Sequence, residues 1–159
     1  MLIKPQTANF AKIRVMGIGG AGNNTLNSMI SQGQIQGVYF VAVNTDAQAL
    51  MMCQSATKLQ IGENLTKGLG SGGDPEIGKQ AAEESKEDIV ELVRGVDMVF
   101  LAGGFGGGTC TGAAPIIANT AKSEGALTIA VVTRPFNFEG SERSRIAEEG
   151  LMRLKEAVD

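Results

Sequence analysis

The sequence contains no histidine and no tryptophan, and it has only two cysteines. Without histidine, neither a Ser-His-Asp nor a Cys-His catalytic triad is possible, and the commonest metal ligand is missing. Cys53 and Cys110 form no Cys-x-x-Cys motif, which is typical of a protein from a reducing cytosol. These absences indicate a protein that depends on neither thiolate-metal nor disulfide chemistry.

An excess of positive charge and long apolar runs are also missing. The 14 basic and 17 acidic residues leave a net charge of −3, so the charge balance indicates no nucleic-acid partner and no anionic-membrane surface. No run reaches about 18 apolar residues, and no basic-then-apolar leader begins the chain. We therefore expect a soluble, cytoplasmic protein without direct membrane insertion. Its length suits one domain over residues 12–159, preceded by a flexible arm over residues 1–11.

Glycine, by contrast, occurs 22 times, about twice the usual share, and mostly in clusters. The densest cluster spans residues 103–112, between an apolar run (98–102) that predicts a buried strand and a helical pattern that begins near Thr111. A strand, a glycine-rich turn and a helix start together predict a phosphate cradle, because backbone N–H groups approach an anion closely where no Cβ intervenes. A flexible linker is the alternative, but linkers rarely separate a dense apolar strand from an amphipathic helix.

A second glycine motif follows the first predicted strand. Gly17, Gly19 and Gly22 have the spacing G-x-G-x-x-G, which places a diphosphate on the N-terminus of the next helix in NAD, FAD and GTP folds alike. The second strand ends in the polar triplet Asn44-Thr45-Asp46. Asp46 is either a carboxylate that binds a ribose or the N-cap of a short helix over residues 47–52, and both interpretations stay open.

Apolar segments that predict strands alternate with helical patterns along the chain. This alternation predicts an α/β fold with a doubly wound, mostly parallel sheet and helices on both faces. One helix of about twenty residues is expected to begin at Asp74 or Pro75 and to end near Arg94-Gly95. The predicted strands cover residues 12–16, 38–43, 58–61, 98–102 and 127–133, and the polar loops that follow them cover 17–24, 44–46, 62–74, 103–112 and 134–140. Ligands of such folds bind beyond the carboxyl ends of the strands, so the residues alone predict a site for a nucleotide with several phosphates.

The segment from Gly106 to Pro115 resembles the G-G-G-T-G-T-G-A-A-P signature of the tubulin/FtsZ family, with Cys110 in place of one glycine. Residues 41–50, 68–70 and 75–78 also fit the family, as does the segment from Val132 to Gly140, so the resemblance covers residues 12–159. It implies a Rossmann-like GTP-binding domain of a bacterial tubulin-like GTPase that polymerises into the division ring.

The resemblance also implies which residues surround GTP or GDP and its Mg²⁺. They are Gly19, Gly20, Ala21, Gly22, Asn23 and Asn24 in the first loop, with one of the two asparagines near guanine; Asn44 and Asp46 near the phosphates and Mg²⁺; Gly70, Ser71 and Gly72 at the γ-phosphate; Gly104, Gly106, Gly107, Gly108, Thr109, Cys110, Thr111 and Gly112 in the phosphate cradle; and Thr133, Pro135, Glu139 and Arg143 on the ribose side. Glu139 and Arg143 are spaced four apart, so a simple helix-start ion pair is the alternative interpretation.

The family hydrolyses GTP with aspartates that the second domain of a neighbouring subunit supplies. The sequence stops before such a domain, so the resemblance implies a truncated GTPase domain with no catalytic residue of its own and little or no activity alone. It implies self-association into filaments and contacts with other division proteins at the mid-cell ring. We expect Cys110 to crowd the phosphates, at an added cost on the order of 1–2 kcal/mol if its φ is positive.

Two other functions remain as alternatives at this point. One is a nicotinamide-dependent reductase that uses the G-x-G-x-x-G motif and Asp46, and the other is a non-catalytic assembly module.

Overall fold

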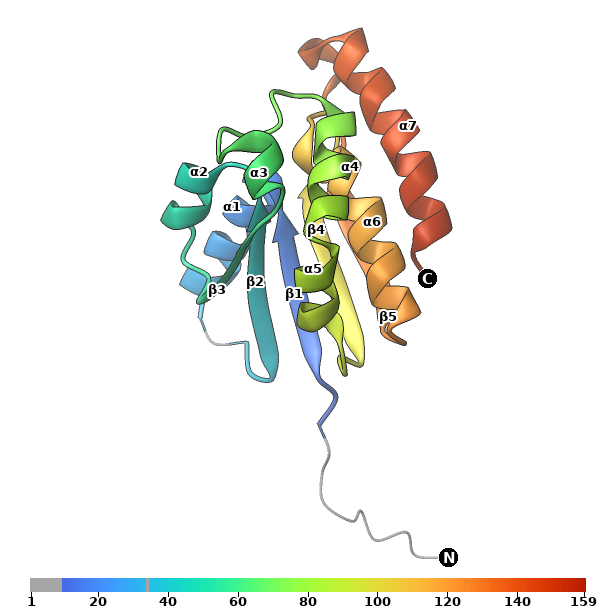
Figure 1. The fold of residues 1–159 in the computed structure, drawn as a ribbon. Coiled ribbons are helices and arrows are strands. Elements are labelled where there is room, and N and C mark those ends of the chain that lie inside the picture. The colour runs from blue at the N-terminus through green and yellow to red at the C-terminus, as the bar shows by residue number, and fades with distance from the viewer. Residues whose placement is uncertain (1–9, 34) are drawn as a thin grey trace, which may run out of the picture.

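The computed structural model describes residues 10–33 and 35–159, and most of the arm expected over residues 1–11 lies outside this part. Figure 1 shows the described chain as an α/β fold in which strands and helices alternate. The strands are β1 (Ile13–Ile18), β2 (Val38–Asn44), β3 (Thr57–Gln60), β4 (Met98–Gly104) and β5 (Leu127–Thr133). The helices are α1 (Gly19–Ser31), α2 (Ala47–Met52), α3 (Glu63–Thr66), α4 (Pro75–Glu84), α5 (Lys86–Val93), α6 (Thr109–Ser123) and α7 (Ser141–Ala157), with a 3₁₀ turn, η1 (Asn137–Glu139).

The strands form one sheet in the order β3-β2-β1-β4-β5, and every neighbouring pair is parallel. The predicted doubly wound parallel sheet is therefore confirmed. The chain leaves β1 toward β2 on one side and later returns to β4 on the other, so the direction of winding reverses between β1 and β4. Ligands of open parallel sheets bind at such a reversal, beyond the carboxyl ends of the strands.

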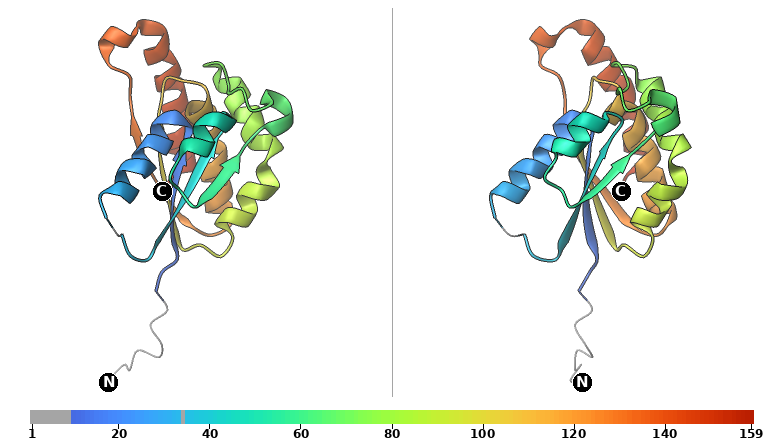
Figure 2. Two further views of the ribbon diagram at one scale, coloured as in Figure 1. Left: turned by 90° about the vertical axis from the view of Figure 1, so that its left-hand side faces the viewer. Right: turned by 60° about the vertical axis from the view of Figure 1, so that its left-hand side comes forward.

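Helices cover both faces of the sheet, as the two views in Figure 2 show. On one face α1 packs against β1, β2 and β4, and on the other α6 packs against β1, β4 and β5. Helices α4 and α7 pack on α6 rather than on the sheet. Neighbouring residues of β1 serve opposite faces: Val15 belongs to the apolar cluster with Leu26 of α1, and Met16 to the cluster with Ile117 of α6. None of the helices in residues 10–33 and 35–159 is both long enough and apolar enough to span a bilayer.

Three helix boundaries differ from those expected. The single helix predicted after Pro75 is interrupted at Ser85 (φ −98°, ψ 22°), and the interruption lets two consecutive side chains reach α3. The Ser85 hydroxyl accepts from the Gly62 amide, while the Glu84 carboxylate accepts from the amides of Asn64 and Leu65. Helices α1 and α6 begin at Gly19 and Thr109, earlier than predicted, so residues expected in loops form first helical turns.

Candidate functional site

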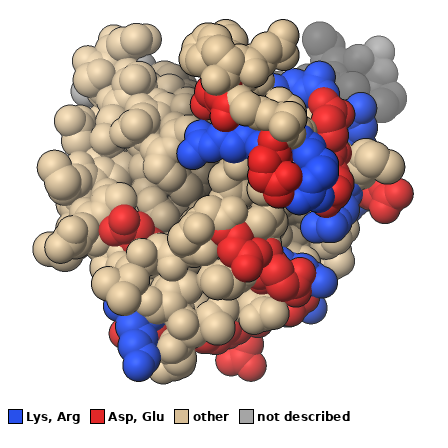
Figure 3. All heavy atoms as spheres, turned by 90° about the horizontal axis from the view of Figure 1, so that it is seen from above, with Lys and Arg blue, Asp and Glu red and all other residues tan. Residues whose placement is uncertain are grey.

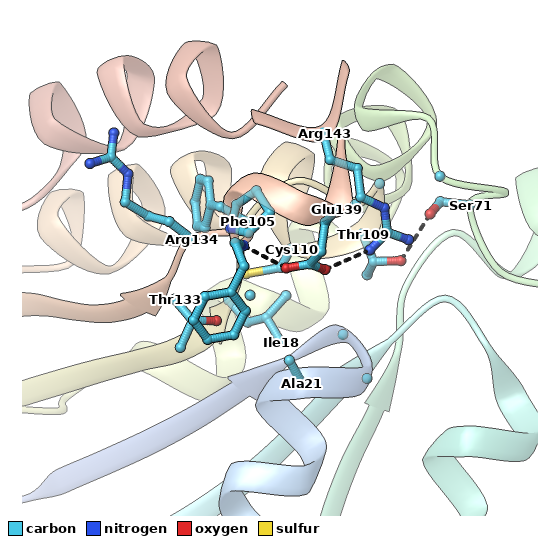
Figure 4. Close-up of a pocket in the computed structure, with 18 residues that line it drawn as sticks. Ile18, Ala21, Ser71, Phe105, Thr109, Cys110, Thr133, Arg134, Glu139 and Arg143 are labelled. Atoms are coloured by element: carbon cyan, nitrogen blue, oxygen red, sulfur yellow. Dashed lines mark hydrogen bonds and ion pairs between the residues drawn. The ribbon is translucent and has the colours of Figure 1, made fainter. Parts of the chain in front are cut away.

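The carboxyl ends of β1, β4 and β5 open into a cavity of about 780 Å³, which we call the nucleotide-sized cavity. This volume lies within the range of small-molecule sites. Figure 4 shows side chains from distant parts of the chain converging on it. The lining residues are Ile18, Gly19, Gly20, Ala21, Ser71, Gly73, Gly104, Phe105, Gly107, Gly108, Thr109, Cys110, Thr133, Arg134, Pro135, Phe136, Glu139 and Arg143.

Most of these residues were predicted from the sequence. Those that were predicted and line the cavity are Gly19, Gly20, Ala21, Ser71, Gly104, Gly107, Gly108, Thr109, Cys110, Thr133, Pro135, Glu139 and Arg143. Gly73, Arg134 and Phe136 were missed, although they lie in loops already expected at the site. Ile18 and Phe105 also lie in expected loops, but they were not assigned to the site because their side chains are apolar.

Two helix N-termini face the cavity without any side chain that caps them. Neither Ile18 at the N-cap of α1 nor Gly108 at the N-cap of α6 makes a side-chain capping bond, and neither first turn contains an acidic residue. By contrast, Asp46 caps α2 and Asp74 caps α4. Free amides and the positive ends of two helix dipoles therefore converge on one cavity, and this arrangement binds anions.

The absence of a side chain at Gly108 is required by packing. A Cβ there would lie 2.2 Å from Ser71 Oγ and 2.7 Å from the Asp74 amide nitrogen. Gly108 therefore lets the loop that carries Ser71 approach the start of α6. Thr109 Oγ1 donates to Ser71 Oγ at 3.1 Å and lies 2.7 Å from Thr45 Oγ1. Three hydroxyl groups thus form a chain at this side of the cavity.

The opposite side of the cavity consists of exposed side chains between β5 and α7. Glu139 Oε2 accepts from the Phe136 amide at 2.6 Å, and Glu139 Oε1 lies 3.4 Å from Arg143 Nη1. The predicted helix-start ion pair is therefore present. The rings of Phe136 and Phe138 stack with centroids 5.3 Å apart. Arg134 points away from this group in Figure 4 and pairs with Glu148.

Cationic side chains do not dominate this surface. Viewed toward the carboxyl ends of the strands, the densest group of charged side chains contains both signs and lies at the upper right, with smaller groups toward the centre and the lower edge (Figure 3). Along α7, Arg145 pairs with Glu142 and Glu149. The hydrogen bond from Arg145 holds the pKa of the Glu142 carboxyl below its usual value. The two arginines of the lining, Arg134 and Arg143, are also paired with carboxylates. The main hydrogen-bond donors that the cavity offers to an anion are therefore backbone amides.

Several predicted site residues do not line the cavity: Gly22, Asn23, Asn24, Asn44, Asp46, Gly70, Gly72, Gly106, Thr111 and Gly112. Two of them are buried and bonded to each other. Asn23 Nδ2 donates to the carbonyls of Gly17 (2.9 Å) and Val43 (3.4 Å), and Asn23 Oδ1 accepts from Asn44 Nδ2 (2.9 Å). These bonds tie α1 to the ends of β1 and β2. The Asp46 carboxylate accepts from the Ala49 amide at 3.0 Å, which confirms the N-cap interpretation.

Two of the remaining glycines are needed for close packing. A Cβ on Gly112 would lie 1.9 Å from the Pro75 carbonyl oxygen, so Gly112 admits α4 against α6. A Cβ on Gly22 would lie 2.5 Å from the Ala102 carbonyl oxygen, so Gly22 brings α1 onto β4. Gly72 and Thr111 instead line a neighbouring cavity of about 430 Å³ beside α7.

Cys110 is not strained in the way the sequence led us to expect. It lies in the first turn of α6, and Lys67 is the only non-glycine residue with positive φ in the part of the chain that the structure describes. Its thiol is directed toward β4, because a Cβ placed on Gly103 would lie 2.2 Å from Cys110 Sγ. Burial raises the pKa of the Cys110 thiol to about 12, so the thiol stays protonated near neutral pH.

A metal site formed by the protein alone is not evident. Within residues 10–33 and 35–159, no three or more His, Cys, Asp or Glu side chains form a group that could hold a metal ion. A magnesium ion at this site would therefore take most of its ligands from phosphate oxygens and water, which is its usual mode of binding beside nucleotides.

Comparison with known proteins identifies the relatives of this fold. The sequence model of the tubulin/FtsZ family GTPase domain matches residues 12–159. An FtsZ dimer from M. jannaschii, in an empty form, superposes with a TM-score of 0.92 at 52% identity. It is matched over 95% of this chain and 44% of its own.

More distant relatives have the same fold. GDP-bound CetZ1 from Haloferax volcanii matches with a TM-score of 0.84 at 26% identity, over 93% of this chain and 49% of its own. A protofilament of CetZ2 from the same organism, bound to GTPγS, matches with a TM-score of 0.83 at 25% identity, over 92% of this chain and 47% of its own. The chain thus spans less than half the length of each of these relatives.

Proposed function

The chain belongs to the tubulin/FtsZ family, and from this premise we propose that it is the guanine-nucleotide-binding domain of a filament-forming GTPase. One observation carries the proposal: the uncapped N-termini of α1 and α6 face the same cavity. Each supplies unpaired amides, and neither carries a nearby acid that would repel phosphate. A nucleotide with two or three phosphates matches both the charge preference and the volume of this cavity.

The proposal assigns different roles to the two sides of the cavity. The amides around Gly19–Ala21 and Gly107–Cys110 bind the phosphate groups, with Ser71 at the terminal phosphate. Glu139 accepts from the ribose hydroxyls, and Arg143 keeps the Glu139 carboxylate in place through their ion pair. Mg²⁺ bound with the nucleotide would neutralise phosphate charge. Asp46, which the sequence assigned to the ion, caps α2 and does not line the cavity, so phosphate oxygens and water would supply most of the ligands.

Hydrolysis requires a group that orients the attacking water. In the part of the chain that the structure describes, Glu139 is the only carboxylate of the cavity lining, and it already accepts from the Phe136 amide and pairs with Arg143. The sequence also lacks histidine. We therefore propose that a neighbouring subunit supplies the catalytic carboxylates.

Self-association follows from this need for a neighbour. The relatives include an FtsZ dimer and a CetZ2 protofilament, so assembly of like subunits occurs within this group of folds. We extend it to this chain as self-association into filaments in the cytoplasm, at the division site and with other division proteins as partners. Imaging of a fluorescent fusion tests the location, since a fusion spread evenly through dividing cells contradicts it.

Isothermal titration of the protein with GTP, GDP, ATP and NADH tests the binding proposal. We expect GTP and GDP to bind more tightly than ATP or NADH. Binding of NADH without any response to guanine nucleotides contradicts the proposal and favours the reductase alternative.

A phosphate-release assay at several protein concentrations tests the catalytic proposal. We expect negligible turnover from the isolated chain, and turnover after addition of a protein that supplies the missing carboxylates. Robust hydrolysis that does not depend on protein concentration shows that this chain holds its own catalytic group.

A further inference from the structure

Thr45 was not assigned to the site from the sequence, although it belongs to the polar triplet at the end of β2. The structure buries it completely, with 0% of its surface exposed. Its carbonyl oxygen accepts from the Gly70 amide and from the Thr66 hydroxyl, each at 3.3 Å. Its own hydroxyl lies 2.7 Å from Thr109 Oγ1. Thr45 therefore joins the end of β2, the loop that carries Ser71 and the start of α6.

The hydrogen bonds of this cluster have a defined direction. A hydroxyl group carries one hydrogen, and Thr109 donates its hydrogen to Ser71 Oγ at 3.1 Å. Thr109 must then accept in its 2.7 Å contact with Thr45, so Thr45 is the donor there. Both threonine hydrogens are thereby used within the protein.

Ser71 is left with a hydrogen to donate. Among the described residues its hydroxyl accepts from Thr109 but donates to no protein group. Its oxygen is held against the start of α6, where Gly108 leaves room for it, and it lines the nucleotide-sized cavity. An acceptor inside the cavity is therefore the natural partner of the Ser71 hydrogen. Hydrogen bonds in such a chain polarise one another, which strengthens the last donor.

We propose that Thr45 is a positioning residue that acts through Thr109 to make the Ser71 hydroxyl a hydrogen-bond donor to the terminal phosphate of the bound nucleotide. This inference rests on the proposed function, which places the terminal phosphate at Ser71. Without the Thr45 hydroxyl, Thr109 is free to rotate its hydrogen away from Ser71, and the Ser71 hydrogen loses its fixed direction. The effect falls on a nucleoside triphosphate more than on a diphosphate, because only the triphosphate reaches Ser71.

Thr45→Val tests the inference, because valine has nearly the shape of threonine and carries a methyl group in place of the hydroxyl. Calorimetry compares its affinities for GTPγS and GDP with those of the unaltered protein. We expect the affinity for GTPγS to fall about fivefold to tenfold, the scale of one lost hydrogen bond, and that for GDP to change less than about twofold. Thr45→Ser, which restores the hydroxyl, should recover the GTPγS affinity.

Two further variants separate positioning from a general loss of packing. Thr120→Val removes a buried hydroxyl that bonds only to the Ile116 carbonyl, away from the cavity, and should leave both affinities unchanged. Thr45→Val combined with Ser71→Ala should weaken GTPγS binding no more than Ser71→Ala alone, because Thr45 acts through Ser71.

The outcomes distinguish the inference from the proposed function. If the unaltered protein binds neither nucleotide, the proposed function is wrong. If it binds both and Thr45→Val keeps its ratio of GTPγS to GDP affinity, or weakens both nucleotides equally, the positioning role of Thr45 is overturned. Additive losses in the double variant also overturn it.

Discussion

The two sides of the nucleotide-sized cavity are built in different ways. The inner side, formed by Gly19, Gly20, Ser71 and residues 107–110, presents backbone amides and short hydroxyls held by buried packing. The outer side, formed by residues 133–136 with Glu139 and Arg143, presents longer side chains, and Phe136 is 68% exposed. The inner side therefore has its binding geometry before a ligand arrives. On the outer side, Glu139 is bonded to the Phe136 amide and to Arg143, and a ligand that bonds to Glu139 must replace some of these contacts. Substitutions that enter the packed contacts of the inner side should impair folding and binding together, and those on the outer side should impair binding alone.

The largest effect is expected from Gly108→Ala on the inner side. The added Cβ would lie 2.2 Å from Ser71 Oγ and within 2.8 Å of backbone atoms of Asp74, which cannot rotate away. We expect a loss of roughly 3 kcal/mol in the free energy of unfolding, together with loss of nucleotide binding. Urea denaturation and calorimetry measure the two effects.

The matched control is the neighbouring glycine. A Cβ on Gly107 meets nothing within 4 Å, so Gly107→Ala should fold normally. Equal stability of the two alanine variants would show that the inner side is not held by close packing, and the contrast between the two sides would fail.

The next effect is expected from Glu139→Ala on the outer side. The loss of a charge-assisted hydrogen bond to ribose should weaken GTP binding by about 1–3 kcal/mol, with little change in the unfolding transition. Glu142→Ala removes a neighbouring acid, in the first turn of α7, which pairs with Arg145 and does not line the cavity, and it should leave affinity unchanged. A stable Glu139→Ala variant with unaltered affinity would limit Glu139 to its ion pair and its bond to the Phe136 amide.

Cys110→Gly restores the residue of the family signature and tests whether the Cys110 side chain contributes to packing on the inner side. Because the thiol packs over Gly103 rather than straining the backbone, its removal should destabilise the fold by about 1 kcal/mol, to which glycine adds up to about 1 kcal/mol in a helix. Thermal unfolding measures this loss. A more stable glycine variant with tighter GTP binding would show instead that the thiol crowds the phosphates.

The smallest effect is expected far from both sides, at Asp159. Its carboxylate accepts from the Thr128 amide at 2.9 Å and pairs with Lys122, and these contacts lower its pKa in the folded protein. Because the pKa of Asp159 is lower in the folded than in the unfolded chain, its ionised carboxylate stabilises the fold at pH values above the unfolded pKa of about 3.9. This contribution is lost as the pH falls through the folded pKa. Asp159→Asn should therefore lower the melting temperature slightly at pH 7, by an amount that shrinks as the pH falls below about 3.9, without changing GTP affinity. A difference that does not shrink over this range would contradict this assignment.

Local patterns were sufficient to predict the architecture and the position of the site. The fifth strand was predicted with its observed bounds, because a continuous apolar run between polar turns allows few other structures. The glycine-rich stretch after β4 was expected to form a phosphate cradle, because consecutive glycines before a helix leave its amides accessible, and residues 104–105 and 107–110 of this stretch line the cavity. These properties depend on residues that are neighbours along the chain, so they can be predicted without the fold.

The roles of individual polar side chains and glycines depend on contacts that form only in the folded chain. Asn23 and Asn44 were assigned to the nucleotide, yet they bond to each other across 21 positions of sequence. Gly112 was assigned to the phosphates, yet it serves the contact of α4 with α6. Thr45 was passed over, yet its hydroxyl reaches Thr109, 64 positions away. The role of a hydroxyl, of an amide or of a glycine without Cβ depends on which atoms lie next to it. Only the folded chain brings those atoms together.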